Sequence, residues 1–341
     1  MKQIRAGSTT LNDVAEDAGV SYQTVSRVIN GHPHVAAVTR QRVLDSVRKL
    51  DYRPNLMARG LVTRRSHTIG IVTFGSTYYG PAQMVANIDR AIQERGYRFA
   101  PTTIPEMSFE SLAGAVQELR ERGVEGIVMI TPILDINLDQ VRNLCAGTPF
   151  VMIDIAVGAQ LPSVVIEQQR GGRLATEHLL QLGHRRLAEI SGPLNWCDAK
   201  LRHDGWIDAH RAAGLSPGTS VESDWSPRGG YLAARRLLDG GTTFSGLVVG
   251  NDQMALGAVR ALREQGVRIP EDVSVIGFDN IPESAFFEPP LTTVVQDFEA
   301  LGRQSAEYLI ALIEYPNTPV HQRVLYPELV VRGSTGRLTE R

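Results

Sequence analysis

The 341 residues are 43% hydrophobic and 21% charged, a composition typical of a folded protein long enough for more than one domain. The two cysteines, Cys145 and Cys197, exclude a disulfide scaffold and a zinc finger and fit a reducing cytoplasm. No apolar run approaches the roughly 18 residues that a membrane-spanning helix needs. Residues 1–12 are too polar for a secretory signal. We therefore expect a cytoplasmic protein with no membrane contact.

The net charge of −2 combines two oppositely charged regions. Residues 1–66 hold 11 Lys and Arg against 5 Asp and Glu, a balance of +6, and the remaining residues carry −8. A small basic region joined to a large acidic one predicts a nucleic-acid contact confined to the basic region. A solvated charged surface is the alternative that charge alone leaves open.

The basic region begins with a pattern of two short helices. Thr10 can cap a helix whose apolar face runs through residues 11–18, with Asp13 as the second member of a capping box. Gly19 allows a tight turn, and Ser21 can cap a second helix over residues 22–30. A helix, a glycine turn and a second helix form the helix-turn-helix pattern.

A third helix is predicted after this pair. Thr39 is expected to cap it, with Val43, Leu44, Val47 and Leu50 as its buried stripe. The three helices together predict a small domain over residues 1–54.

The second helix is the candidate for reading DNA bases. Tyr22, Gln23 and Arg27 point away from its apolar side, and in a major groove Arg27 can pair with guanine and Gln23 with an adenine or a neighbouring edge. Short polar side chains suited to phosphate oxygens lie around it: Ser21, Thr24, Ser26, Asn30 and His34. A small helical bundle with a polar face is the alternative.

The following segment predicts a short hinge helix. Pro54 ends the preceding helix, and Asn55 can cap residues 56–62. A helix this short is marginal in water, so it should order only against a partner, such as a minor groove wedged open by Leu61. The alternative is a linker that packs its leucines on the rest of the chain.

These segments together resemble the LacI/GalR family of bacterial repressors. The matching residues are Leu11-Asn12-Asp13-Val14-Ala15, Gly19-Val20-Ser21, Thr24-Val25-Ser26-Arg27-Val28-Ile29-Asn30, Thr39-Arg40, Tyr52-Arg53-Pro54-Asn55 and Ala58-Arg59-Gly60-Leu61. The resemblance implies that Tyr22, Gln23 and Arg27 read bases. It also implies that Asn55 begins the hinge helix and that Ala58 and Leu61 enter the minor groove at the operator centre.

From residue 68 the sequence alternates between apolar strands and amphipathic helices, which predicts parallel sheets covered by helices on both faces. The rhythm occurs twice, so we expect an α/β body of two lobes, and the family resemblance implies the two-lobed type I periplasmic-binding-protein fold. We predict a helix-turn-helix domain over residues 1–54, a hinge and linker over 55–67, and an effector-binding domain over 68–341. Within the effector-binding domain, the N-lobe is predicted over about 68–166 and 298–325, and the C-lobe over about 167–297 and 326–341.

Polar residues follow several of these strands, where ligands bind in parallel sheets. Asp154, Asn251 and Asp279 follow strands, and Arg202 and Trp225 lie near boundaries. Carboxylates, an amide and an arginine can hold sugar hydroxyls while an aromatic ring covers an apolar sugar face. Singly, these residues are also compatible with turns or core positions.

The resemblance extends to a sugar pocket known in this family. It implies pocket roles for Pro81, Asp154, Arg202, Trp225, Asn251, Asp279, Gln296 and Phe298. Four positions depart from that pattern: Phe74 and Tyr78 add bulk, Ile130 replaces an amide, and Asp198 replaces a small hydroxyl. A galactoside-like ring, a glucoside and a longer oligosaccharide therefore all remain open.

Enzyme motifs are weak in this chain. Residues 214–218 fit G-x-S-x-G, but a helix precedes Ser216, and Pro217 has no N–H for an oxyanion hole. The glycines at 171–172 lack the spacing of a dinucleotide loop, and the histidines lack metal-ligand spacing. A glycosidase that uses Asp154 and Asp279 is the remaining enzyme alternative.

We therefore predict a repressor that needs no cofactor or metal. Its partners are a pseudo-palindromic double-stranded operator, a sugar inducer bound between the lobes, and a second copy of the chain. A corepressor-type protein that binds a purine is the alternative within the family. No apolar heptads follow the last predicted strand, so we expect dimers rather than tetramers.

Overall fold

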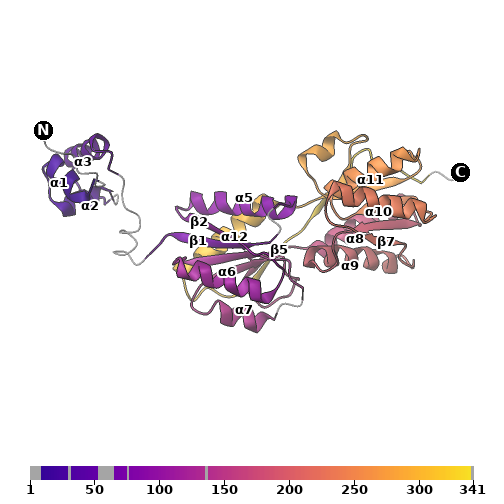
Figure 1. Ribbon diagram of the computed structural model, residues 1–341, viewed down its shortest axis with the longest axis horizontal. Helices are drawn as coiled ribbons and strands as arrows, with labels where there is room; N and C mark the ends of the chain where they lie inside the picture. Colours follow the sequence, from indigo (N-terminus) through magenta and orange to yellow (C-terminus); the bar gives the residue numbers. More distant parts are fainter. Residues whose placement is uncertain (1–8, 30–31, 53–64, 75–76, 135–136, 339–341) are drawn as a thin grey trace. The chain divides into compact units, whose positions relative to one another are not determined.

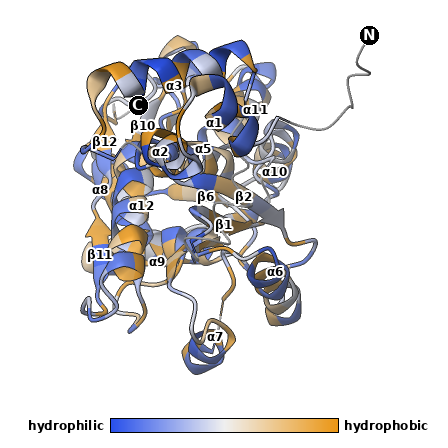
Figure 2. Ribbon diagram, turned by 90° about the vertical axis from the view of Figure 1, so that its left-hand side faces the viewer, coloured by the Kyte–Doolittle hydropathy of each residue, from blue (hydrophilic) through white to orange (hydrophobic). Residues whose placement is uncertain are grey.

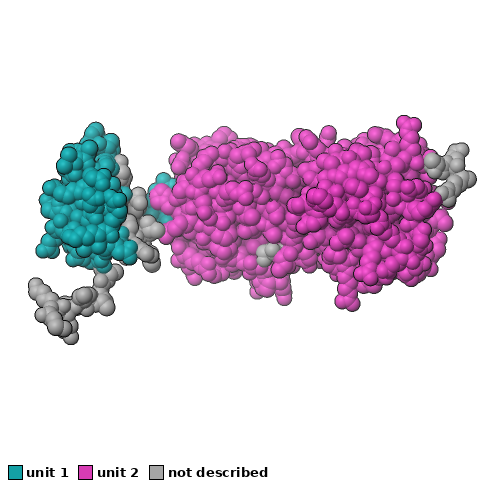
Figure 3. Space-filling view, turned by 90° about the horizontal axis from the view of Figure 1, so that it is seen from above, with its two compact units in different colours: residues 1–66 teal, residues 67–341 magenta. Residues whose placement is uncertain are grey.

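The computed structural model describes residues 9–29, 32–52, 65–74, 77–134 and 137–338. The chain divides into two compact units, Met1–Ser66 and His67–Arg341, which we call the head and the body (Figure 3). Among the described residues, no helix combines the length and the apolar character needed to cross a bilayer.

In its described residues, 9–29 and 32–52, the head contains three helices around a small apolar core (Figure 1). The helices are α1 (Leu11–Ala18), α2 (Tyr22–Ile29) and α3 (Ala37–Lys49). Val14, Val25 and Val43, one from each helix, are buried against one another. The predicted start of α1 is confirmed, because the Thr10 hydroxyl accepts from the Asp13 N–H and the Asp13 carboxylate accepts from the Thr10 N–H at 2.7 Å.

Two details of the third helix differ from the prediction. Thr39 lies inside α3, which begins after Ala36 without a side-chain cap. Leu44 is 39% exposed, whereas Ser46 is buried. The physical reason is the helical period. Ser46 lies three residues after Val43 and so on the same inward face of the helix, whereas Leu44 is rotated by about 100° about the helix axis from Val43.

The first half of the body is built on a parallel sheet with strand order β11-β5-β4-β3-β1-β2. The strands are β1 (Thr68–Thr73), β2 (Arg98–Thr103), β3 (Gly126–Ile130), β4 (Phe150–Ile153), β5 (Ser163–Ile166) and β11 (Gln322–Leu325). Helices α5 (Tyr79–Glu94) and α12 (Phe298–Glu314) cover one face, and α6 (Phe109–Glu121) and α7 (Leu138–Leu144) cover the other (Figure 1). We call this layered unit the N-lobe.

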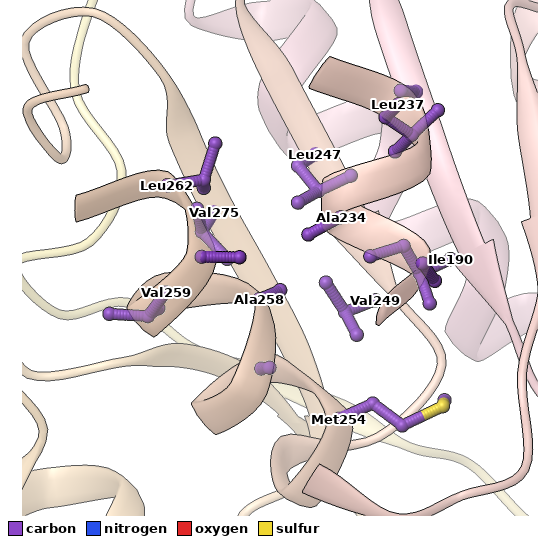
Figure 4. Packing of buried hydrophobic residues seen from close by; sticks show 14 of the residues in the cluster. Ile190, Ala234, Leu237, Leu247, Val249, Met254, Ala258, Val259, Leu262 and Val275 are labelled. Atoms are coloured by element: carbon purple, nitrogen blue, oxygen red, sulfur yellow. The ribbon is translucent and has the colours of Figure 1, made fainter. Parts of the chain in front are cut away.

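The second half repeats the plan with strand order β12-β10-β9-β8-β6-β7. The strands are β6 (Leu187–Ser191), β7 (Ser220–Glu222), β8 (Gly246–Val249), β9 (Ser274–Asp279), β10 (Thr292–Val295) and β12 (Glu328–Val330). Helices α8 (Gln168–Gln181) and α9 (Cys197–Ala212) cover one face, and α10 (Pro227–Asp239) and α11 (Asp252–Glu264) cover the other. Figure 4 shows the packing of α10 and α11 on this sheet, where Leu237 of α10 and Leu262 of α11 pack toward Leu247 of β8. This unit is the C-lobe.

The helices of the body are amphipathic, whereas several strands are buried along their whole length. Figure 2 shows hydrophilic and hydrophobic segments alternating along the helical ribbons. Strands β3, β4 and β8 are buried at every position. Continuous apolar strands between amphipathic helices are the expected pattern of a parallel sheet with two covered faces.

The chain passes between the lobes three times within residues 67–338. It crosses after β5, between β10 and α12, and between β11 and β12. The crossing segments carry Gln168 and Gln296, whose positions matter for the pocket described below. One strand departs from the parallel prediction, because β12 pairs antiparallel with β10.

Close helix packing in the C-lobe depends on glycine. A Cβ on Gly172 of α8 would lie 2.1 Å from the Arg202 carbonyl oxygen of α9, a distance that requires one helix to shift. Gly172→Ala should therefore lower the free energy of unfolding of the body by about 1–3 kcal/mol or more. Chemical denaturation followed by circular dichroism measures this change.

The matched control is Gly114→Ala on α6. No atom lies within 4 Å of a Cβ built there, so alanine should stabilise the helix by about 0.5–1 kcal/mol. Equal effects of the two substitutions would contradict the close-packing argument.

Candidate functional site

A pocket of about 420 Å³, a volume that includes space open to solvent, lies between the N-lobe and the C-lobe, within the body. It opens at the carboxyl ends of the strands, where β4, β8 and β9 end. Its lining residues are Tyr78, Tyr79, Gly80, Pro81, Met84, Asp154, Trp196, Asp198, Arg202, Trp225, Asn251, Asp279 and Gln296. The N-terminal end of α5 supplies one wall, and α9 with the ends of β8 and β9 supplies the other.

Three lining residues have a left-handed backbone conformation that side-chain-bearing residues rarely adopt. Asp154 follows β4 with a φ of 61°, Trp225 precedes α10 with a φ of 70°, and Asp279 ends β9 with a φ of 102°. Such conformations cost on the order of 1 kcal/mol or more each and concentrate at ligand sites. The surrounding fold therefore holds these side chains in place against a local preference.

Arg202 of α9 is the centre of the polar network. Its Nε donates to Gln168 Oε1 at 2.9 Å, and its Nη1 donates to the Gly250 carbonyl oxygen at 2.6 Å. The same nitrogen lies 3.6 Å from Asp279 Oδ1, and the guanidinium carbon lies 3.8 Å from the ring centre of Phe278. Arg202 is only 7% exposed, and these contacts hold its side chain in place without a ligand.

Two crossing segments are joined through the same network. Gln168 Nε2 donates to Gln296 Oε1 at 2.8 Å, and Gln296 Nε2 donates to Asp279 Oδ1 at 2.6 Å. All three side chains are buried. A ligand that contacts Asp279 or Gln296 therefore also touches the connections between the two lobes.

Burial shifts the pKa values of the pocket acids upward. Desolvation, followed by the charge of Asp198, raises the pKa of Asp154 well above its ordinary value. Desolvation raises the pKa of Asp198, although Arg202 opposes the shift. Burial raises the pKa of Asp279 to about 6, against the lowering effects of Arg202 and Gln296. The pocket without a ligand therefore disfavours three negative charges at once.

Aromatic rings form the other part of the lining. The Trp196 ring centre lies 5.4 Å from that of Tyr78 and 6.0 Å from that of Trp225. Trp196 also pairs through its backbone with Ile133, so this N-lobe loop and the start of α9 are tied together. The rings provide flat apolar surface beside the carboxylates.

Most of the predicted pocket residues line the cavity. They are Tyr78, Pro81, Asp154, Asp198, Arg202, Trp225, Asn251, Asp279 and Gln296. Phe74 and Phe298 do not line it. The Phe74 ring centre lies 5.3 Å from that of Trp196, and the Phe298 ring centre lies 6.1 Å from that of Tyr79. Ile130 is fully buried in β3.

Four lining residues were not predicted: Tyr79, Gly80, Met84 and Trp196. Trp196 lies in the loop between β6 and α9, beyond the carboxyl end of a strand, which is a position where ligands bind in parallel sheets. Tyr79, Gly80 and Met84 carried a weaker signal, since they neighbour Tyr78 and Pro81, which the family resemblance placed at the pocket.

Asn251 has a structural task in addition to its place in the pocket lining. Its side-chain oxygen accepts from the Met254 N–H at 2.8 Å and so caps α11. Its amide nitrogen donates to the Trp225 carbonyl oxygen at 3.2 Å. A ligand contact of Asn251 would therefore also affect the loop that carries Trp225.

The predicted base-reading side chains lie on one exposed face of α2. Tyr22, Gln23 and Arg27 are exposed, whereas Val25 and Val28 point into the head. Ser21 Oγ accepts from the Thr24 N–H, Ser26 is half-buried and His34 is exposed. Four further predicted DNA contacts lie outside the described residues: Asn30, Asn55, Ala58 and Leu61.

The G-x-S-x-G motif does not form a nucleophile elbow. Ser216 follows α9 and precedes β7, so a helix and not a strand leads into it. This placement agrees with the rejection of a serine hydrolase.

The pocket acids predict a pH dependence of stability. The pKa of Asp279 is raised from 3.8 to about 6, so its contribution to stability is complete below pH 3.8 and is lost as the pH rises through about 6. Between pH 4 and 7 the wild type should lose about 2–3 kcal/mol relative to Asp279→Asn, which keeps an acceptor for Gln296. Denaturant unfolding of both proteins across this range tests the prediction, and parallel curves would contradict it.

Comparison with known proteins assigns both units. The model of "Bacterial regulatory proteins, lacI family" matches residues 10–55, and that of "Periplasmic binding protein-like domain" matches residues 176–335. The lactose operon repressor of Escherichia coli (strain K12) is 37% identical over 326 residues, which cover 96% of this chain and 90% of the relative. The repressor PurR of Haemophilus influenzae is 35% identical, covering 95% of this chain and 98% of the relative.

Solved structures agree with these relatives. A lac repressor dimer bound to operator and the anti-inducer ONPF has a TM-score of 0.91 at 35% identity, covering 97% of this chain and all of that chain. A complex of the regulator CelR with cellobiose has a TM-score of 0.71 at 33% identity, covering 96% of this chain and 99% of that chain. With such identity over nearly its whole length, the chain belongs to the LacI family of bacterial regulatory proteins.

Proposed function

We propose that a sugar bound in the pocket of the body releases this LacI-family DNA-binding repressor from its operator. The observation that carries the proposal is the pocket lining, in which buried carboxylates, an amide and an arginine face aromatic rings. Carboxylate and amide oxygens accept hydrogen bonds from sugar hydroxyls, and an indole ring packs against the apolar face of a sugar. A galactoside or related glycoside is the expected class of effector.

The relatives support a sugar more than other effectors. The CelR structure contains cellobiose, and another LacI-family structure, 28% identical to this chain, contains ribose. A phosphorylated sugar is disfavoured, because its charge would add to those of Asp154, Asp198 and Asp279 with only Arg202 to oppose them among the lining residues. The protein binds the sugar without converting it, so no covalent bond of the sugar is made or broken.

Binding can change the DNA affinity only if the ligand prefers one arrangement of the lobes. The Gln168–Gln296–Asp279 network joins the pocket to two of the crossing segments, so lobe closure around a sugar would alter the N-lobe. We infer that this change disfavours an ordered hinge over residues 55–62, a segment outside the described residues. The operator affinity then falls.

We propose that two chains act together in the cytoplasm. Two heads of a homodimer would bind a pseudo-palindromic operator, each placing α2 in a major groove. Contacts to phosphates would supply much of the affinity, which should fall steeply with salt.

Thermal-shift screening tests the class of effector. A ligand that binds only the folded protein raises its melting temperature in proportion to RT ln(1 + [L]/Kd). The panel contains mono- and disaccharides together with hypoxanthine and guanine. A sugar that raises the melting temperature and weakens DNA binding supports the proposal. A response to a purine alone, with tighter DNA binding, would establish a corepressor, and hydrolysis of a chromogenic galactoside would establish an enzyme.

The role of α2 predicts the effect of a single substitution in the head. Arg27→Ala should cost about 1–3 kcal/mol of operator binding and relax the base preference at one operator position. Competition gel shifts with single-base operator variants measure both effects. Arg211→Ala, which removes an exposed arginine of the body, is the control and should change neither. Equal weakening on every operator variant would show that Arg27 contacts only phosphates.

A further inference from the structure

The charged groups of the pocket do not balance. Its lining contains two buried carboxylates, Asp154 and Asp279, the half-buried carboxylate of Asp198, and one guanidinium. Arg202 lies 3.6 Å from Asp279 and 4.0 Å from Asp198, so its positive charge is shared between these two acids. Asp154 is 7% exposed, and among the described residues no group donates a hydrogen bond to it. One carboxylate in the pocket therefore lacks a partner.

The position of Asp198 makes the imbalance larger. Asp198 is the second residue of α9, where the helix N-terminus favours a negative charge, and Arg202 follows one turn later. A negative Asp198 opposes the ionisation of Asp154, whose pKa burial and this charge raise. An unpaired buried acid of this kind is costly unless it is protonated or meets a positive group.

The aromatic rings that share the pocket lining with the two acids suit the same kind of group. Trp196 and Trp225 are 8% and 6% exposed and line the pocket with Tyr78. A cation over an indole face is attracted by the negative potential of the ring, and the attraction grows when water is excluded. The Arg202 guanidinium already lies over the Trp225 ring at 5.5 Å, so Trp196 is the indole in the lining that is left for an incoming cation.

We propose that the effector is a sugar that carries a protonated amino group, which binds beside Asp154 and Asp198 against the ring of Trp196. This inference rests on the proposed function, because it names the class of sugar that the same pocket takes. The amino group would donate hydrogen bonds to both carboxylates and would bring the charge of the pocket closer to zero. The remaining hydroxyls would bind Arg202, Asn251 and Asp279.

Matched sugars separate the amino group from the ring. Glucosamine, N-acetylglucosamine and glucose share one ring, as do the three corresponding galactose derivatives, and only the free amines are cationic at about pH 6. Calorimetric titration of the full chain should show the amino sugar binding at least about tenfold more tightly than both partners of its series. The free disaccharide of glucosamine, compared with cellobiose, extends the test to longer ligands.

Asp198→Asn tests the acid without changing its size. The substitution should abolish most of the preference for the amine, and Asp198→Ser provides a second variant with the same expectation. Asp204→Asn is the control on the same helix, because Asp204 pairs with Lys200 and does not line the pocket. It should leave the preference unchanged.

The outcomes distinguish a failure of the amino-sugar preference from a failure of sugar binding itself. If glucose, galactose or the N-acetylated sugars bind as tightly as the amines, the amino-sugar inference is overturned while the sugar-binding function stands. An unchanged preference in both Asp198 variants also overturns it. If no sugar of the panel binds at all, the proposed function falls and the inference falls with it.

Discussion

Replacing Arg202 with alanine is expected to lower the free energy of unfolding of the body by about 3–5 kcal/mol and to abolish the effector response. The guanidinium bonds Gln168 and the Gly250 carbonyl oxygen and lies beside two acids. Its removal leaves the buried Asp279 and the half-buried Asp198 without a counter-charge. Denaturant unfolding measures the loss of stability, and operator titrations with and without the sugar measure the response.

Arg211→Ala on the same helix is the matched control. Its side chain is 75% exposed and pairs with Asp208, so we expect a change below about 0.5 kcal/mol. Arg202→Lys keeps the charge but not the forked geometry, and should fold while responding weakly to the sugar. A normal sugar response in both Arg202 variants would contradict the pocket assignment.

Asp154→Asn is expected to separate ligand binding from stability. The sugar affinity should fall by roughly 10- to 100-fold, because a hydrogen bond to a charged acceptor is replaced by a weaker one. The unfolding free energy at neutral pH should rise, because the substitution removes a raised-pKa acid that accepts no hydrogen bond from the described residues. Operator affinity without sugar should stay at the wild-type level.

Calorimetry and denaturant unfolding of the same preparation measure the two effects of Asp154→Asn together. Asp204→Asn, outside the pocket lining, should leave the sugar affinity unchanged. A variant that loses both stability and sugar affinity would indicate that Asp154 supports the fold rather than the ligand.

The head could be predicted from the sequence because its signals are local. The Thr10–Asp13 capping box, the turn at Gly19 and the spacing of Val25 and Val28 each act within a few residues. The errors at Thr39 and Leu44 arose from one wrong helix start and one side chain assigned to the wrong face. Neither error changes which face of α2 is exposed.

The pocket was only partly predictable, because it joins segments that are far apart in the chain. Residues that directly follow buried strands, such as Asp154 and Asp279, could be found from strand patterns and from the family resemblance. Gln168 could not, since the short strand β5 before it was not predicted. Trp196 was also missed, because its contacts with Tyr78 and Ile133 depend on how the two lobes meet.

Short elements were missed for a related reason. Strand β7 has three residues at a sheet edge, α7 has seven residues, and β10 begins with two threonines. Their stability comes from neighbouring strands and helices, and a short segment has too few residues to establish a period. Tertiary contacts decide their structure.

The most direct test of the account is an operator titration in the presence of a bound effector. A duplex selected from a randomised pool by the full chain is titrated by fluorescence anisotropy at fixed salt, with and without a saturating sugar from the thermal-shift screen. The account predicts that the sugar raises the dissociation constant of wild-type protein for this duplex and has no such effect on Arg202→Ala. A sugar that raises the melting temperature but leaves the operator affinity of the wild type unchanged would contradict it.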